Sequence, residues 1–180
     1  MKKVTGELVE NRVIVWNVDD SRKLYSEGFY GKPLGVAKPK GTDFDAPLIL
    51  DLIEAYYLAQ SKLLRVKRGG RKVDLAHLRS KCLKEYVGFN EKYVVYKHLR
   101  SLGYVVTPGI KFGCDFAVYR HGPGIDHAPF LIQVMKPSDE VTATHMVLSG
   151  RLATTVRKQF LIASVTRETS TYLAFDWWRA

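Results

Sequence analysis

The chain has 180 residues and 46% of them are hydrophobic, which is enough apolar material for one sizeable folded domain or two small ones and excludes a disordered chain. Lysine and arginine number 28 against 18 acidic residues, so the net charge is +10. This surplus favours a polyanionic partner, most commonly the phosphate backbone of a nucleic acid. The two cysteines, Cys82 and Cys114, form neither a CxxC pair nor a zinc-ligand spacing. We therefore expect neither a disulfide framework nor a structural zinc site. We also expect no cofactor.

The N-terminal residues lack the apolar core of a signal peptide, and the apolar runs are too short to span a bilayer. We therefore expect a cytoplasmic protein without membrane contact.

The first part of the chain predicts short strands followed by a loop. Alternating apolar residues indicate strands at 4–10, 12–16 and 23–31, separated by Gly and by Asp-Asp-Ser. The segment 31–45, GKPLGVAKPKGTDFD, combines prolines, glycines and lysines, so it is expected to be a lysine-bearing loop.

Two helices are expected to follow this loop. Asp45 would cap a helix over 48–64, which is apolar on a broad face. A positively charged turn is predicted at 68–72, RGGRK, and Asp74 would cap a second helix over 74–86. A boundary near GFN at 88–90 then divides an N-terminal domain, 1–88, from a C-terminal domain, 89–180.

The C-terminal domain predicts a helix over 91–103, capped by Asn90 and ended by Gly103. Its buried stripe would comprise Val95, Leu99 and Leu102. The strands expected after this helix are at 104–107, 114–120, 130–136, 159–165 and 171–178. The strand at 130–136 is almost wholly apolar, so it should be central.

A further helix is expected between the last strands, over 138–158, with Ser138 or Asp139 as its cap. In the strand at 114–120, side-chain alternation would place Ala117 and Tyr119 with Asp115 on one face, and Cys114 with Phe116 and Val118 on the other. The expected class is α+β: a small strand-plus-helix domain followed by a mixed sheet flanked by helices.

Three residues at the edges of these elements suit metal-independent cleavage of RNA: Tyr119, His127 and Lys158. In such a reaction the 2′-hydroxyl loses a proton, the leaving 5′-oxygen gains one, and the phosphorane carries extra negative charge. A histidine suits the acid because its reference pKa is about 6.5, and a lysine suits the cation. A tyrosine can accept or relay the first proton if a neighbour lowers its pKa.

Two alternatives remain open from the residues. Asp115 followed by LIQVMK resembles a metal-dependent nuclease of the restriction-enzyme type, with Gln133 in one expected place. Met135 occupies the lysine place, and a single carboxylate makes a poor magnesium site. The second alternative is a non-catalytic RNA-binding subunit.

Three segments resemble the tRNA-splicing endonuclease family over residues 90–166: EKYVVYKHLRSLGYVVTPGIKFGCDFAVY, IDHAPFLIQV and SGRLATTVRKQFLIASV. The resemblance implies a C-terminal nuclease domain and a metal-independent triad of Tyr, His and Lys. By motif these are Tyr119, His127 and Lys158, and His121 lies too close to the strand end to match. An intact triad implies a catalytic subunit that cleaves precursor tRNA at a bulge-helix-bulge, giving 2′,3′-cyclic phosphate and 5′-hydroxyl ends.

The same resemblance implies RNA contacts outside the triad. Family arginines hold a bulged base by cation–π stacking, and Arg151 and Arg179 are the positions carried over here. The loop 31–45 resembles an insertion of archaeal heterotetrameric members, in which Lys38 or Lys40 would contact phosphate.

The resemblance also predicts a partner. Homotetrameric members carry an acidic loop between the last two strands, whereas here VTRETSTY holds only Glu168, beside Arg167. We therefore expect a second, different subunit and an α2β2 heterotetramer. The aromatic final strand, with Trp177 and Trp178, is expected to lie at a subunit interface.

Overall fold

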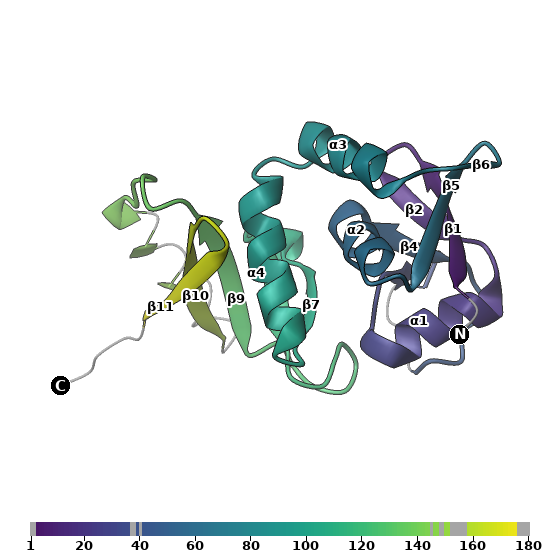
Figure 1. The fold of residues 1–180 in the computed structure, drawn as a ribbon. Helices are drawn as coiled ribbons and strands as arrows, with labels where there is room; N and C mark the ends of the chain where they lie inside the picture. The colour runs from purple at the N-terminus through teal and green to yellow at the C-terminus, as the bar shows by residue number, and fades with distance from the viewer. Residues whose placement is uncertain are drawn as a thin grey trace. The chain divides into compact units, whose positions relative to one another are not determined.

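A computed structural model of the protein describes residues 3–36, 39, 41–144, 146–147, 150–151 and 158–175. The chain divides into two compact units, Met1–Phe89 and Asn90–Ala180, and each combines helices with one mixed sheet (Figure 1). The α+β class expected from the sequence is confirmed. Within the described ranges, no helix has the length and apolar character needed to cross a membrane.

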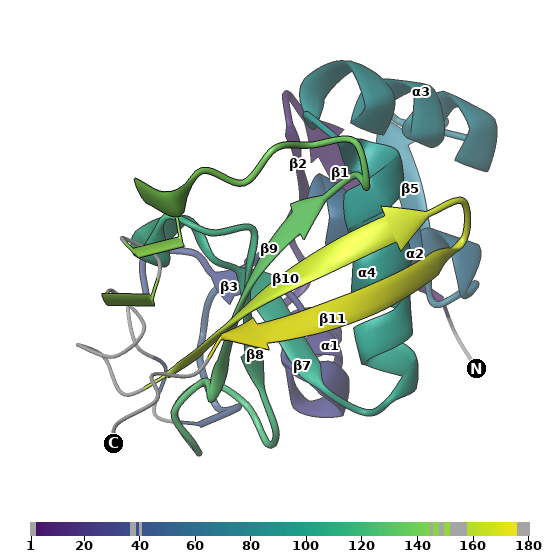
Figure 2. The ribbon, with the colours of Figure 1, turned by 90° about the vertical axis from the view of Figure 1, so that its left-hand side faces the viewer.

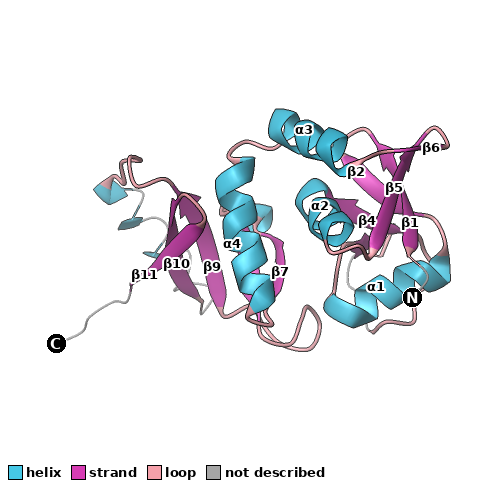
Figure 3. Ribbon diagram, in the orientation of Figure 1, coloured by secondary structure: helices cyan, strands magenta, loops and turns pink. Residues whose placement is uncertain are grey.

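The first unit is built on a six-stranded sheet with the order β3-β4-β2-β1-β5-β6. Its strands are β1 (Val4–Val9), β2 (Arg12–Val15), β3 (Lys32–Pro33), β4 (Leu48–Asp51), β5 (Leu64–Arg68) and β6 (Arg71–Lys72). Only β1 and β5 pair in parallel. The unit's helices are α1 (Val18–Gly28), α2 (Leu52–Gln60) and α3 (Leu75–Glu85), and α2 packs against α3 (Figure 3).

Two expectations for this unit are wrong, and helix caps explain both. Residues 23–31, expected as a strand, lie mostly in α1, which begins after Asn17 because the Asn17 side chain accepts the N–H of Asp20. The helix expected over 48–64 starts only at Leu52. Its first four residues form β4, and Asp51, not Asp45, makes a capping box with Glu54.

The second unit is built on a five-stranded sheet with the order β11-β10-β9-β8-β7 (Figure 2). Its elements are α4 (Phe89–Ser101), β7 (Val105–Pro108), the 3-10 helix η1 (Ile110–Phe112), β8 (Phe116–Tyr119), β9 (Phe130–Met135), β10 (Gln159–Thr166) and β11 (Thr169–Phe175). The central position expected for 130–136 is confirmed. β9 and β10 run parallel, and the other pairs are antiparallel.

Three local expectations for α4 and β8 are wrong. Asn90 lies inside α4 and does not cap it, because the helix begins at Phe89. Leu102 follows the end of α4 and is 60% exposed. Cys114 precedes β8, so strand alternation does not apply to it, and it packs with Ala117 instead of Phe116.

The helix expected over 138–158 begins later than its predicted caps. The described residues at 143–144, 146–147 and 150–151 are helical, and Met146 N–H donates to the Thr142 carbonyl at 3.1 Å. The Asp139 carboxylate instead accepts the Lys136 N–H in a preceding turn. Residues 152–157 lie outside the described part of the chain.

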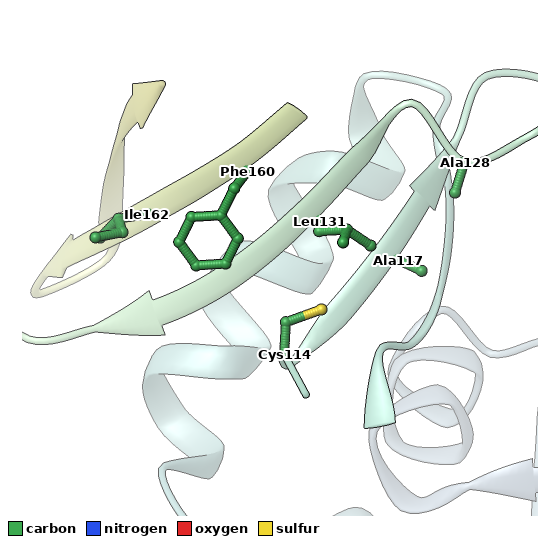
Figure 4. Packing of buried hydrophobic residues seen from close by; sticks show 6 residues of the cluster. All are labelled: Cys114, Ala117, Ala128, Leu131, Phe160 and Ile162. Carbon is green, nitrogen blue, oxygen red and sulfur yellow. The ribbon is translucent and has the colours of Figure 1, made fainter. Parts of the chain in front are cut away.

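One face of the second sheet carries a compact apolar cluster: Cys114, Ala117, Ala128, Leu131, Phe160 and Ile162. Ala117, Leu131 and Phe160 lie side by side across β8, β9 and β10 (Figure 4). The opposite face receives α4, whose Tyr96 ring contacts Phe116 at 6.0 Å between centroids. The row of Ala117, Leu131 and Phe160 therefore identifies the face of the sheet on which the apolar cluster lies.

Candidate active site

The strand register brings Tyr119 and Lys158 to the same end and the same face of the second sheet. Val118 pairs with Phe130, and Phe130 pairs with Gln159. One step further along, Tyr119, Pro129 and Lys158 follow as the next row. Tyr119 packs against the apolar cluster of this face, and so does Phe112, whose ring lies 5.4 Å from Lys158 Nζ. Two strand spacings of about 4.8 Å separate the backbones of Tyr119 and Lys158, a gap that two long side chains can close around one phosphodiester.

The loop between β8 and β9 is organised by the carboxylate of Asp126. Its oxygens accept the backbone N–H groups of Arg120 at 3.1 Å, His121 at 3.2 Å and Gly122 at 2.8 Å. Burial alone would raise the pKa of Asp126, but these backbone donors together lower it. The carboxylate is thus ionised at neutral pH and closes the loop upon itself.

Lys158 ties this loop to the start of β10. Its Nζ donates to the Ala128 carbonyl at 2.6 Å and lies 5.4 Å from the centroid of the Phe112 ring. Burial lowers the pKa of Lys158, and the charge of Asp126 opposes that effect. The ammonium group is therefore held next to the residue that follows His127.

Tyr119 is half-buried and packs against the apolar cluster. Burial raises its pKa, the hydrogen bond with the Thr107 side chain lowers it, and the charge of Asp126 raises it further, so the net direction is upward. The sequence argument required a neighbour that lowers this pKa. The described surroundings do the opposite, and Tyr119 stands as a neutral phenol at neutral pH.

His127 is exposed and lies between Asp126 and the buried Ala128. Both of its neighbours are anchored, Asp126 by its backbone hydrogen bonds and Ala128 by Lys158. The imidazole is therefore presented to solvent at the same end of the sheet as Lys158. His121 is also exposed, and its backbone N–H belongs to the Asp126 network.

The expected RNA contacts are placed only in part. Arg151 lies on the helical segment that precedes β10 and is exposed. Lys38, Lys40 and Arg179 lie outside the described residues, as do Trp177 and Trp178.

Asp115 and Gln133, the basis of the metal alternative, contact each other in an arrangement that uses the carboxylate for structure. Asp115 accepts Gln133 Nε2 at 2.8 Å and the Val134 N–H at 2.7 Å, and Lys92 Nζ lies 2.7 Å from its other oxygen. Across the part of the chain that the structure describes, no three His, Cys, Asp or Glu side chains gather as metal ligands do. The residues present do not fit a magnesium site, because three donors already satisfy the lone carboxylate.

Sequence reasoning missed the roles of Asp126 and Thr107. Asp126 stands directly before His127 in the quoted segment IDHAPFLIQV, but its bonds run back to the backbone of Arg120, His121 and Gly122, a direction that the local sequence does not signal. Thr107 had no signal in the sequence, because its proximity to Tyr119 depends on the pairing of β7 with β8.

Comparison with known proteins places both units of the chain in one family. A model of the tRNA intron endonuclease catalytic C-terminal domain matches residues 89–173, and a model of the N-terminal domain of tRNA intron endonuclease matches residues 4–79. Relatives named tRNA-splicing endonuclease include proteins from Hyperthermus butylicus, 42% identical, and Sulfurisphaera tokodaii, 37% identical. The alignments cover 97% and 96% of this chain and 98% and 97% of the relatives.

A relative with the same name from Pyrobaculum aerophilum is 44% identical over 93% of this chain and 94% of its own length. The similarity thus extends through both units and not only through the segments quoted above. The chain belongs to the tRNA intron endonuclease family and carries both that family's N-terminal domain and its catalytic C-terminal domain.

Proposed function

We propose that this chain is the catalytic subunit of a tRNA-splicing endonuclease that cuts precursor tRNA at bulge-helix-bulge sites without a metal. The observation that carries the proposal is that Tyr119 and Lys158 lie at the same end of the second sheet, with His127 directly before Ala128, whose carbonyl accepts the Lys158 Nζ–H. A bulge supplies unstacked nucleotides whose backbone can adopt the in-line geometry that a regular helix forbids.

The proposed reaction breaks one bond and forms one bond at phosphorus. Tyr119 takes the proton of the 2′-hydroxyl, and the 2′-oxygen attacks the adjacent phosphorus. The bond to the 5′-oxygen breaks, and His127 protonates that oxygen. Lys158 stabilises the extra negative charge on the phosphorane. The products are a 2′,3′-cyclic phosphate and a 5′-hydroxyl.

The raised pKa of Tyr119 constrains its part in this scheme. A neutral phenol can accept a hydrogen bond from the 2′-hydroxyl, but it takes up the proton only as it releases its own. In our proposal Tyr119 therefore acts through a relay: as the phenol takes up the proton of the 2′-hydroxyl, it releases its own proton to solvent water.

The expected second subunit is supported by the β10–β11 turn. Thr166 pairs with Thr169, so the turn consists of Arg167 and Glu168 alone. One carboxylate beside a guanidinium cannot serve as an acidic docking loop. We propose that a different subunit supplies that loop in an α2β2 assembly.

One cleavage assay tests the chemistry. The chain and its partner are incubated with bulged precursor RNA in excess EDTA, and the ends of the products are mapped. We expect cleavage with cyclic phosphate and 5′-hydroxyl ends, and a loss of about 10²- to 10⁴-fold in rate for His127→Ala. His121→Ala, a matched exposed histidine in the same loop, should cleave at nearly the wild-type rate.

The alternatives give different results in the same assay. Activity that EDTA abolishes and magnesium restores would favour metal-dependent cleavage. RNA binding without cleavage in every assembly would favour a non-catalytic subunit. Wild-type activity of His127→Ala would remove this histidine from the mechanism.

A further inference from the structure

A strongly basic hairpin in the first unit has no part in the proposed chemistry. Strands β5 and β6 join through Gly69 and Gly70 and carry five cations within eight residues: Arg65, Lys67, Arg68, Arg71 and Lys72. We call residues 65–72 the basic hairpin. Four of the five cations are exposed, and Lys67 is half-buried.

The turn at the tip is tight and requires glycine. Gly69 has φ of 53° and Gly70 has φ of 77°, a pair of positive values that suits a two-residue hairpin loop of type I′. No heavy atom lies within 4 Å of a Cβ built at either position. The tip is therefore narrow and unobstructed.

The pairing of the strands sets like charges directly opposite each other. Lys67 pairs with Lys72, and Arg68 pairs with Arg71. Like charges opposite each other in an antiparallel pair are destabilising, and among the described residues no carboxylate forms a salt bridge with any of these four. Glu7 lies next to Lys67 in the parallel register but does not form such a bridge. This arrangement weakens the isolated fold and favours an external anion.

The two pairs point to opposite faces of the hairpin. Residues 67 and 68 are consecutive, and side chains alternate along a strand, so the lysine pair and the arginine pair face away from each other. A flat acidic surface could meet only one of the pairs. A groove with phosphates along both walls, as in a folded RNA, could meet both.

A groove of about 250 Å³ lies at the base of the hairpin. Lys3, Arg65 and Lys72 line it together with apolar side chains, Ala59, Leu64, Val66, Val73, Leu75 and Leu78. Asp74 also lines it, but its carboxylate accepts the His77 N–H as the cap of α3. Cations beside an apolar wall suit a nucleotide, which offers a phosphate next to a ribose and a base.

We propose that the basic hairpin is a second RNA-binding element, which holds the phosphate backbone of the precursor RNA at a place other than the cleavage site. The proposal rests on the proposed function, which supplies the RNA. It assigns to the N-terminal unit a role in affinity and none in the chemical step.

The test compares two double variants of the chain in its active assembly. Arg68→Gln/Arg71→Gln removes one cross-strand pair of the hairpin. Lys62→Gln/Lys84→Gln is the matched control, because it removes two exposed cations from the same unit, one between α2 and β5 and one on α3, outside both the basic hairpin and the loop 31–45. Precursor tRNA binding is measured from low to moderate salt, and the cleavage rate is measured at saturating RNA.

We expect the hairpin variant to bind about 10-fold more weakly at low salt, with a slope of log affinity against log salt shallower by about 1.5. Its cleavage rate at saturating RNA should equal that of the wild type. Its melting temperature should be equal or higher, because a repulsive pair has been removed. Arg68→Lys/Arg71→Lys should keep the wild-type slope, since a phosphate contact needs only the charge.

An equal effect of the hairpin and control variants on affinity and salt slope would overturn the proposal. So would loss of co-purification with the partner subunit at unchanged RNA affinity, which would assign the hairpin to an acidic protein. Failure of the proposed function is recognised separately, because the wild-type assembly would then not cleave.

Discussion

At the scale of single residues, Asp126 is the side chain on which the geometry of the site depends. It closes the loop that carries His127, and its charge acts on the pKa values of both Tyr119 and Lys158. Asp126→Asn keeps the size of the side chain but turns an amide NH₂ towards backbone donors that need an acceptor. We expect the cleavage rate at saturating RNA to fall about 10- to 100-fold through misplacement of His127, with the KM unchanged.

The matched control for this change is Asp139→Asn, which alters a carboxylate that also accepts a backbone N–H in an exposed turn. Hydrogen exchange of the Gly122 amide should accelerate in Asp126→Asn and stay slow in the control. A pH titration of the same amide protection tests independently whether the ionised carboxylate is required. Because the backbone hydrogen bonds lower the pKa of Asp126 below its ordinary value, protection of this amide should be complete at neutral pH and be lost only as the pH falls through that lowered pKa. Unchanged exchange and rate in Asp126→Asn would contradict the positioning role.

Asp115 should matter to stability and not to metal binding. Its carboxylate is nearly buried and is met by Lys92, Gln133 and the Val134 N–H. Asp115→Ala would remove the ion pair with Lys92 and the hydrogen bonds with Gln133 and Val134, so we expect the free energy of unfolding to fall by about 2–3 kcal/mol. Urea denaturation measures this fall, and added magnesium should not change it in the wild type.

Asp43→Ala is the control for Asp115, because the Asp43 carboxylate also pairs with a cation, Arg22, but is 95% exposed. Its loss should change the free energy of unfolding by less than about 1 kcal/mol. Equal effects of the two changes would show that burial does not increase the contribution of Asp115 to the free energy of unfolding.

At the scale of elements, the cap of α2 supports a direct comparison of the expected and the observed helix start. Asp51 is buried, accepts the Ile53 N–H and forms a capping box with Glu54, whereas Asp45 is exposed and caps no helix. Asp51→Ala should lower the free energy of unfolding by about 1–2 kcal/mol. Asp45→Ala should leave it nearly unchanged, and denaturant midpoints of the two variants measure the difference.

The elements that sequence periodicity predicted correctly are those with a clear apolar pattern and a local cap. Strand β9 is apolar throughout, and α3 begins after Asp74 as expected. The prediction of one helix over 48–64 was wrong because β4 is almost entirely buried and apolar. Its residues therefore continue the apolar pattern of α2 without a visible break. Periodicity cannot divide such a run, and only the Asp51 cap does.

For the site, too, only the features with a local sequence pattern could be predicted. The shared face of Ala117 and Tyr119 could be predicted from alternation along one strand. The alignment of Lys158 with Tyr119 depends on a parallel pairing of β9 with β10, which is long-range and leaves no local signal. The raised pKa of Tyr119 likewise depends on burial by residues distant in sequence.

At the scale of the whole molecule, the two units carry different parts of the proposed function. The second unit holds the residues proposed for cleavage, and the first holds the basic hairpin. A net charge of +10 suits both parts, because each must meet a polyanion. The charge also opposes close association of identical chains, whose surfaces repel each other at low salt.

The assembly is therefore expected to require a different chain. The β10–β11 turn of Arg167 and Glu168 adds no net negative charge, so a second copy of this chain cannot offer an acidic loop to a basic partner surface. The purified chain alone should cleave bulged RNA weakly or not at all. Titration with an acidic-loop partner should raise the cleavage rate to a plateau at equal amounts of the two chains, and sedimentation should show a complex of two copies of each. Full activity of the chain as a homo-oligomer would contradict this expectation, because contacts other than the turn would then be sufficient for assembly.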